Sequence, residues 1–239
     1  MKKDVIIIEN FYENPLEIRG YALKELKENY YLPYQDNPPT WYSTVYKESN
    51  ICPFKSSKSL VTTFEKIIGE KIDLEHWNSA WNPNCDGNKT PVSEKSTRWN
   101  GSFHFKPICP LEKPGNRVHT HCINPKNTWN NVGHNNWAGL IYLNPNQPID
   151  AGLMNFMHQG GRGEDHKEYM VDLFKDAEKR WVLVDNFGSL FNRLILQRSE
   201  IPHQGANGFS NLLEDGRLFQ TFFFKTLDKE TIDPIKINL

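Results

Sequence analysis

Three histidines stand in a pattern that could bind one metal ion. Val118-His119-Thr120-His121 has the character of a short strand, and residues two apart on a strand point to the same face. The imidazoles of His119 and His121 could therefore reach a single ion. His203 lies far along the chain, after the apolar run 193–197, and a fold that brings distant strands together would add it as a third ligand. Neutral imidazole suits iron, zinc and copper, so the sequence predicts a three-histidine metal site.

Arg217 is the second residue type with clear chemical potential. It opens the run Arg-Leu-Phe-Gln-Thr-Phe-Phe-Phe, which is mostly apolar and has the composition of a buried strand. A guanidinium at the start of such a strand is either a buried ion-pair partner or a group that binds the carboxylate of a ligand. The sequence leaves both interpretations open.

The segments that must position these residues are mostly short β-strands. From about residue 102 the chain alternates between β-prone runs and turns that contain Asn, Gly or Pro. Many short strands separated by turns are typical of a sandwich, a barrel or a jelly roll. The predicted strands are Ser102–Lys106, Arg117–Cys122, Trp137–Leu143, Leu153–His158, Arg180–Asp185, Arg193–Gln197 and Leu218–Thr226.

The first hundred residues predict a strand and two helices that cover this β region. Val5–Ile8 has the composition of a buried strand, and Asn14-Pro15 begins a helix of amphipathic period. A second helix is predicted over Ser59–Ile68, with Gly69 ending it. Residues 30–57 and 78–101 are rich in turn formers and are predicted to be loops. We expect one domain over 1–239, with the cover at about 1–100 and the β core at about 101–228.

Composition excludes several classes of function. The chain has 28 Lys and Arg against 29 Asp and Glu, so its charge gives no signal for binding nucleic acid or an anionic membrane. The apolar run after Lys2-Lys3 is too short for a secretory signal, and no stretch is long enough to span a membrane. The four cysteines show no CxxC spacing, which favours reduced thiols and a cytoplasmic location.

The order of these pieces resembles the iron(II)/2-oxoglutarate-dependent oxygenases, in particular the prolyl-hydroxylase-like branch. The matching pieces are VHTH, WAGLIYLNPNQPIDAG, IPHQG and GRLFQTFFF, together with the opening VIIIENFYENPLEIRGYAL. The resemblance implies a jelly-roll (double-stranded β-helix) fold of mainly β structure with flanking helices. It also implies Fe(II) bound by His119, His121 and His203, and 2-oxoglutarate as a co-substrate whose far carboxylate binds Arg217. The implied reaction is hydroxylation of a small molecule or peptide that the sequence does not identify.

Two departures from the family pattern keep other functions open. His121 stands where the family has a metal-binding carboxylate, and Ala151-Gly152-Leu153 replaces the usual Gly-Gly-Thr. A neutral ligand raises the net charge of the site by about one unit and weakens the binding of hard cations. The chain could instead be a three-histidine, cupin-like dioxygenase that does not use 2-oxoglutarate, or a catalytically silent binding module. His121 could also lie outside the ligand set.

Four other histidines are predicted to be structural. His104 lies in the strand-like run Phe-His-Phe-Lys without a second ligand-type residue beside it. Three further histidines stand in loops or at the end of a strand, where exposed or hydrogen-bonded side chains are expected: His134, His158 and His166. The glycine-containing stretch 160–168 lacks phosphate-loop spacing and is predicted to be a loop.

Overall fold

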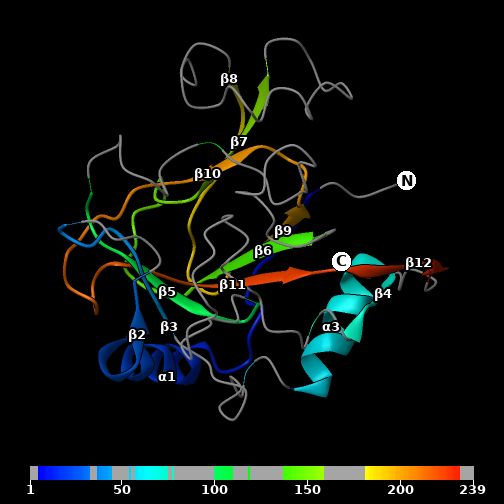
Figure 1. The fold of residues 1–239 in the computed structure, drawn as a ribbon, viewed down its shortest axis with the longest axis horizontal. Coiled ribbons are helices and arrows are strands. Elements are labelled where there is room, and N and C mark those ends of the chain that lie inside the picture. The colour runs from blue at the N-terminus through cyan, green and yellow to red at the C-terminus, as the bar shows by residue number, and fades with distance from the viewer. Residues whose placement is uncertain are drawn as a thin grey trace, which may run out of the picture.

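The structure is a computed structural model, and it describes residues 5–32, 37–44, 54, 57–74, 77, 100–109, 118, 137–158 and 181–231. Most of the described chain lies in antiparallel β-sheets, and two helices of more than two turns accompany them (Figure 1). The helices are α1 (Pro15–Glu28) and α3 (Lys58–Ile68).

The large sheet has seven strands in the order β1-β9-β6-β11-β5-β3-β2. Every pairing within it is antiparallel. Its central strand β11 is flanked by β6 and β5, so both of its edges are hydrogen-bonded within the sheet. The strands are β1 (Val5–Ile8), β2 (Tyr30–Tyr31), β3 (Tyr42–Thr44), β5 (Phe103–Lys106), β6 (Trp137–Tyr142), β9 (Leu194–Arg198) and β11 (Arg217–Phe224).

Two smaller sheets complete the described β structure. The first has three antiparallel strands in the order β10-β7-β8, and Figure 1 shows it above the large sheet in that view. The second pairs β12 with β4 beside α3. Their strands are β4 (Glu70–Ile72), β7 (Leu153–His158), β8 (Trp181–Phe187), β10 (His203–Gly205) and β12 (Thr226–Thr231).

The helices cover the face of the large sheet that lies opposite to the β10-β7-β8 sheet. Pro15 stands at the start of α1, where its fixed φ suits the helix and its missing N–H costs nothing. Gly69 ends α3 in the left-handed conformation, with φ of 74°. One continuous apolar core joins the two helices to alternate residues of β5, β6, β9 and β11; its members include Ile18, Ala22, Leu26, Leu60, Phe64, Phe103, Trp137, Leu196, Phe222 and Phe224.

A second core lies between the large sheet and the β10-β7-β8 sheet. Leu153 of β7 packs there against Leu140, Tyr142, Ile195 and Phe219 from the large sheet. Because side chains alternate along a strand, this set defines which residues of each strand face the space between the two sheets. We call this side the inner face. Two antiparallel sheets packed face to face, with helices outside, form a jelly roll.

Most predicted elements are confirmed. The strand at Val5–Ile8 and the two helices occur where they are expected, and so do six of the seven predicted β-strands, with ends shifted by at most a few residues. The seventh, Arg117–Cys122, lies outside the described residues except for Val118. The prediction of a loop over 30–57 is wrong in part, because β2 and β3 extend the large sheet there. A run of only two or three paired residues has no sequence period by which it could be recognised.

Candidate functional site

Polar and charged side chains gather on the inner face at one end of the two sheets. Register places them there: Lys106 lies opposite Arg217, and His203 lies opposite Asn155. All four side chains are buried, each with at most 5% of its surface exposed. Buried polar groups in this number are costly to a fold unless they pair with one another or with a ligand. This end of the molecule is therefore the candidate site.

His203 is held in the form that binds metal ions. It begins β10, and its Nδ1 lies 2.7 Å from the carbonyl oxygen of Ile201. A carbonyl only accepts, so Nδ1 carries the proton and donates it in this hydrogen bond. The lone pair is then on Nε2, which is the arrangement of a histidine ligand oriented by a backbone carbonyl.

Arg217 begins β11 and is 1% exposed. Its Nε donates to the carbonyl oxygen of Ala151 at 3.0 Å, and Nη2 lies 3.5 Å from that of Gly152. The guanidinium also stacks 4.5 Å from the ring centroid of Phe219. No carboxylate contacts Arg217 within the described ranges, so its charge is met there only by neutral groups. Burial lowers the pKa of Arg217 from its usual value.

Gly205 connects His203 to Arg217. It lies two residues after His203 on β10, so both face the same side of that strand. A Cβ built on Gly205 would lie only 3.1 Å from Nη2 of Arg217, which means that the guanidinium packs directly on the glycine backbone. Because residues two apart on a strand are separated by roughly 7 Å, a ligand of four or five carbons could reach from the His203 imidazole to the guanidinium.

The hydroxyl of Tyr142 is a further polar group on the inner face. The ring is fully buried, and its hydroxyl interacts with the guanidinium of Arg217. The Arg217 guanidinium carbon lies 5.9 Å from the centroid of this ring. Burial raises the pKa of Tyr142 to about 12, although the neighbouring guanidinium opposes the rise. At neutral pH the group is therefore a protonated donor near the cation.

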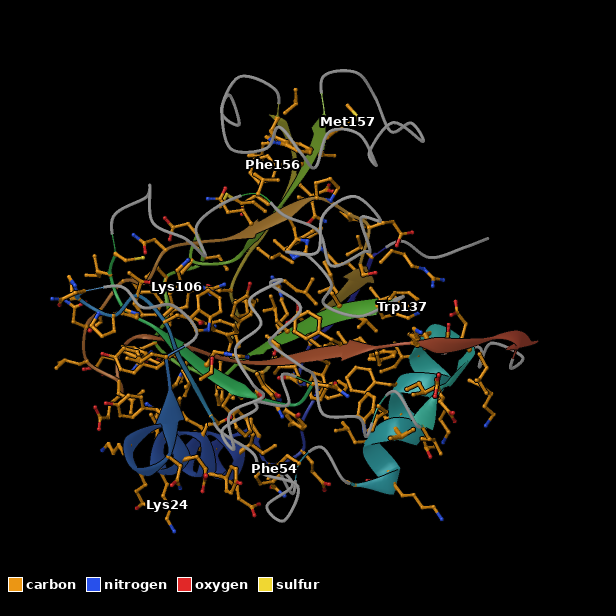
Figure 2. All side chains as sticks on the ribbon, in the orientation of Figure 1. Lys24, Phe54, Lys106, Trp137, Phe156 and Met157 are labelled. Carbon is orange, nitrogen blue, oxygen red and sulfur yellow. The ribbon has the colours of Figure 1, made fainter. Side chains whose placement is uncertain are left out.

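Lys106 provides a second buried cation. Its Nζ donates to the carbonyl oxygen of Ala206 at 3.1 Å and lies 5.5 Å from the ring centroid of Trp41. Burial is the main cause of a fall in the pKa of Lys106 to about 7, and repulsion by the charge of Arg217 adds to it. In Figure 2 Lys106 lies between the large sheet and the β10-β7 layer.

His104 belongs to a hydrogen-bonded cluster next to these cations. Its Nδ1 accepts from Nε1 of Trp41 at 3.1 Å and lies 2.7 Å from Oγ of Ser43. Its Nε2 lies 2.8 Å from Oγ1 of Thr221 and donates to it. Burial, and then the charge of Arg217, lower the pKa of His104 to about 3, so the ring is neutral. The prediction that His104 is structural agrees with both ring nitrogens being occupied by protein groups.

Two more buried side chains on this face carry an unpaired oxygen among the described residues. They are Oδ1 of Asn155, opposite His203, and Oε1 of Gln197 on β9. Asn155 lies two residues after Leu153 on β7, and Gln197 lies two residues after Ile195 on β9. Because Leu153 and Ile195 pack on the inner face, both amides face that side as well.

The sequence predicted part of this site. Two predicted residues, His203 and Arg217, are brought to the same end of the inner face. The predicted ligands His119 and His121 lie outside the described residues, and the side chain of His158 does too. Sequence reasoning missed Lys106, Asn155 and the hydroxyl of Tyr142. The alternation in Phe-His-Phe-Lys was a usable signal, since it places His104 and Lys106 on one face.

The described residues bear on two of the predictions. They contain no group of three His, Cys, Asp or Glu side chains arranged to hold a metal ion. Within the same part of the chain, no helix has the length and apolar character that crossing a membrane requires.

Comparison with known proteins identifies the fold. No protein-family model and no curated protein matches the sequence. The non-heme alpha ketoglutarate dependent carbocyclase SnoK from nogalamycin biosynthesis matches with a TM-score of 0.51 at 12% identity, over 98% of this chain and 84% of that one. The chain has the jelly-roll fold of 2-oxoglutarate oxygenases. At this identity the likeness concerns the fold and not the reaction.

Two further solved structures match at lower scores. A Pseudomonas putida prolyl-4-hydroxylase has a TM-score of 0.46 and 13% identity, over 94% of this chain and 93% of that one. HygX from Streptomyces hygroscopicus, with nickel, 2-oxoglutarate and hygromycin B bound, has a TM-score of 0.47 and 11% identity, over 95% of this chain and 84% of that one.

Proposed function

We propose that this chain is a non-haem Fe(II) oxygenase that uses 2-oxoglutarate and hydroxylates a small molecule or peptide. Its metal ligands are His203 together with His119 and His121, and Arg217 binds the far carboxylate of 2-oxoglutarate. The single observation that carries the proposal is the state of Arg217. A guanidinium that is 1% exposed, with no carboxylate partner in the described chain, is a binding group for an anionic ligand.

The surroundings of Arg217 fit a carboxylate. Ala151 and Gly152 each offer only a backbone carbonyl to it, so the guanidinium is oriented without being neutralised. The hydroxyl of Tyr142 lies on the same side, keeps its proton at neutral pH, and can donate to a carboxylate oxygen. A ligand bound there would gain charge-assisted hydrogen bonds in a site that excludes water.

His203 fits the metal end of the site, because Ile201 fixes its tautomer and leaves Nε2 as the metal-binding atom. Bound Fe(II) would supply the activation of dioxygen, coupled to decarboxylation of the 2-oxo acid and oxidation of a substrate C–H bond. The chain itself contributes orientation: His203 fixes one end of the co-substrate and Arg217 the other, while the inner-face core around Phe219 keeps the site dry.

The alternative of a three-histidine dioxygenase that does not use 2-oxoglutarate differs in one respect. It needs the same imidazoles but gives Arg217 no ligand to bind. A binding module without a metal needs neither the metal-binding imidazoles nor a ligand for Arg217. The buried guanidinium is therefore the feature that favours 2-oxoglutarate use over both.

The test is an anaerobic titration. Purified protein is loaded with Fe(II), 2-oxoglutarate is added, and the visible charge-transfer band of a chelated 2-oxo acid is followed. We expect a saturable band in the parent protein, no band in His203→Ala, and at least tenfold weaker saturation in Arg217→Met. Arg19→Met is the matched control, because Arg19 binds the Glu214 carbonyl oxygen on the outer surface, away from the site.

The other outcomes discriminate between the alternatives. Iron bound at about one per chain without any band would favour the three-histidine dioxygenase. Absence of iron binding would leave the binding module. A band whose saturation is unchanged in Arg217→Met would contradict the role given to that residue.

A further inference from the structure

Lys106 and Arg217 form a pair of buried like charges on the inner face. They are direct partners in the antiparallel register of β5 and β11, and opposite residues in such a pair point to the same side. Their exposed fractions are 0% and 1%. Like charges directly opposite each other destabilise a sheet, and burial makes the cost larger. The large sheet maintains this arrangement at its centre.

The β10 segment holds both cations from the other side. Gly205 lies against the guanidinium of Arg217, and the carbonyl oxygen of the next residue, Ala206, accepts from Lys106 Nζ. The two cationic heads therefore meet consecutive residues, Gly205 at the end of β10 and Ala206 just after it, a short way beyond His203. An anion that reached Arg217 along this strand would come close to Lys106 as well.

We propose that Lys106 is a second co-substrate-binding residue, which together with Arg217 selects a 2-oxo acid that carries a carboxylate at its far end. This proposal rests on the function proposed above and adds to it a residue that sets co-substrate specificity. The two cations favour a dicarboxylate over a monocarboxylate of equal length, because a single far carboxylate can receive donors from both. Lys106 is a binding residue for the anion and takes no part in a covalent step.

The protonation state of Lys106 gives the proposal a second readout. Among the described residues, the groups around it that carry or can change charge include Arg217 on β11 and Cys109 after β5, with the neutral His104 on its own strand. With a pKa of about 7, Lys106 is half charged near neutrality in the free protein. Binding of an anion favours the charged form, so dicarboxylate binding takes up a proton above that pH.

The experiment measures binding and not turnover. Protein loaded with Mn(II), which keeps the site redox-silent, is titrated calorimetrically with 2-oxoglutarate and with 2-oxopentanoate, which lacks the far carboxylate. The variants are Lys106→Met, which removes the charge, and Lys106→Arg, which keeps it. Lys24→Met is the matched control, since Lys24 is an exposed lysine on α1, far from Lys106 in Figure 2.

We expect Lys106→Met to bind 2-oxoglutarate about 10- to 100-fold more weakly, the range of one charged hydrogen bond. Its affinity for 2-oxopentanoate should stay within twofold of the parent, Lys106→Arg should recover part of the loss, and Lys24→Met should show none. Equal affinity of the parent and Lys106→Met for 2-oxoglutarate would overturn the proposal, and so would an equal loss for both acids.

The parent protein alone gives an independent test should Lys106→Met fail to fold. Its affinity for 2-oxoglutarate should fall by up to tenfold per pH unit above about pH 7, while its affinity for 2-oxopentanoate should change much less. Parallel pH profiles for the two acids would overturn the proposal.

A metal-free arm separates this proposal from the oxygenase function. Glutarate, which has two carboxylates and no keto group, is added to the protein without metal, and the melting temperature is measured. If 2-oxoglutarate does not bind with metal, but glutarate stabilises the parent and not Lys106→Met, the two-cation site stands and the oxygenase function falls. If neither acid binds, both proposals are overturned.

Discussion

The buried ring of His104 predicts a measurable dependence of stability on pH. Its pKa in the folded protein is about 3, whereas an unfolded histidine titrates near 6.5. Between these values the unfolded chain binds a proton that the folded chain does not. Stability conferred by the neutral ring is therefore complete above about pH 6.5 and is lost as the pH falls below it. The cause is burial of the ring, with both nitrogens already engaged by Trp41, Ser43 and Thr221.

The size of this effect follows from linkage. One group that takes up a proton only on unfolding changes the free energy of unfolding by about 1.4 kcal/mol per pH unit. Between pH 7.5 and pH 5.0 the integrated loss is about 2 kcal/mol. Urea denaturation of the parent and of His104→Gln at these two pH values gives the quantity directly, as the difference between the two pH dependences. Carboxylates and other histidines contribute alike to both proteins and cancel.

Ser43→Ala serves as the control for that measurement. It removes one hydrogen bond to the His104 ring but leaves the titrating group, so it should lower stability equally at both pH values. A parent protein and a His104→Gln variant that lose the same stability between pH 7.5 and pH 5.0 would refute the assignment of a neutral, buried His104.

Three further predictions concern stability and are all checked by urea denaturation at pH 7.5. Gly208→Ala should cost about 2–4 kcal/mol of stability, because a Cβ there would overlap backbone atoms of Lys106 and Pro107 at the end of β5. Gly20→Ala in α1, where a Cβ would meet open space, should instead stabilise by about 0.5–1 kcal/mol. Burial alone would raise the pKa of Glu70, but hydrogen bonds from Arg198 and other groups outweigh it, and the net pKa is lowered. Glu70→Gln should therefore cost about 2 kcal/mol of stability, and no cost would show that the ion pair with Arg198 is unimportant. Gln197→Met removes a buried oxygen that has no partner among the described residues, so it should stabilise by about 1 kcal/mol, and a loss would indicate a partner for that oxygen.

Burial explains why three of the central strands could be predicted from composition. Strands β6, β9 and β11 are buried along their whole length, and each contains an apolar run, WAGLIY in β6, LIL in β9 and FFF in β11. β2, β3 and β10 have two or three residues each, and their pairing depends on partners far along the chain. Local patterns carry no information about such pairing, so these strands could not be predicted.

The same limit applies to the candidate site. Arg217 was predicted because a charged residue opens a mostly apolar run, and His203 because it follows the apolar run 193–197 in the piece IPHQG that resembles the oxygenase family. Lys106 closes the short run Phe103–Lys106, where an exposed lysine is the ordinary expectation. Only its register with Arg217 shows that the side chain faces inward and is buried. The charge at the candidate site is therefore a property of strand pairing and not of any one segment.

The charged form of Lys106, which favours binding of an anion, should oppose folding because the charge is buried. Its pKa is about 7 in the folded chain and near 10.4 when unfolded, so between these values the unfolded chain binds more protons. Stability should then rise with pH, and the parent should gain about 2 kcal/mol relative to Lys106→Met between pH 7 and pH 9. Urea denaturation at both pH values measures this gain. A bound dicarboxylate raises the pKa of Lys106 towards its unfolded value, so saturating 2-oxoglutarate should reduce the gain. A gain that is absent without ligand, or unchanged with it, would show that the charge of Lys106 is compensated within the protein and is not directed at an anion.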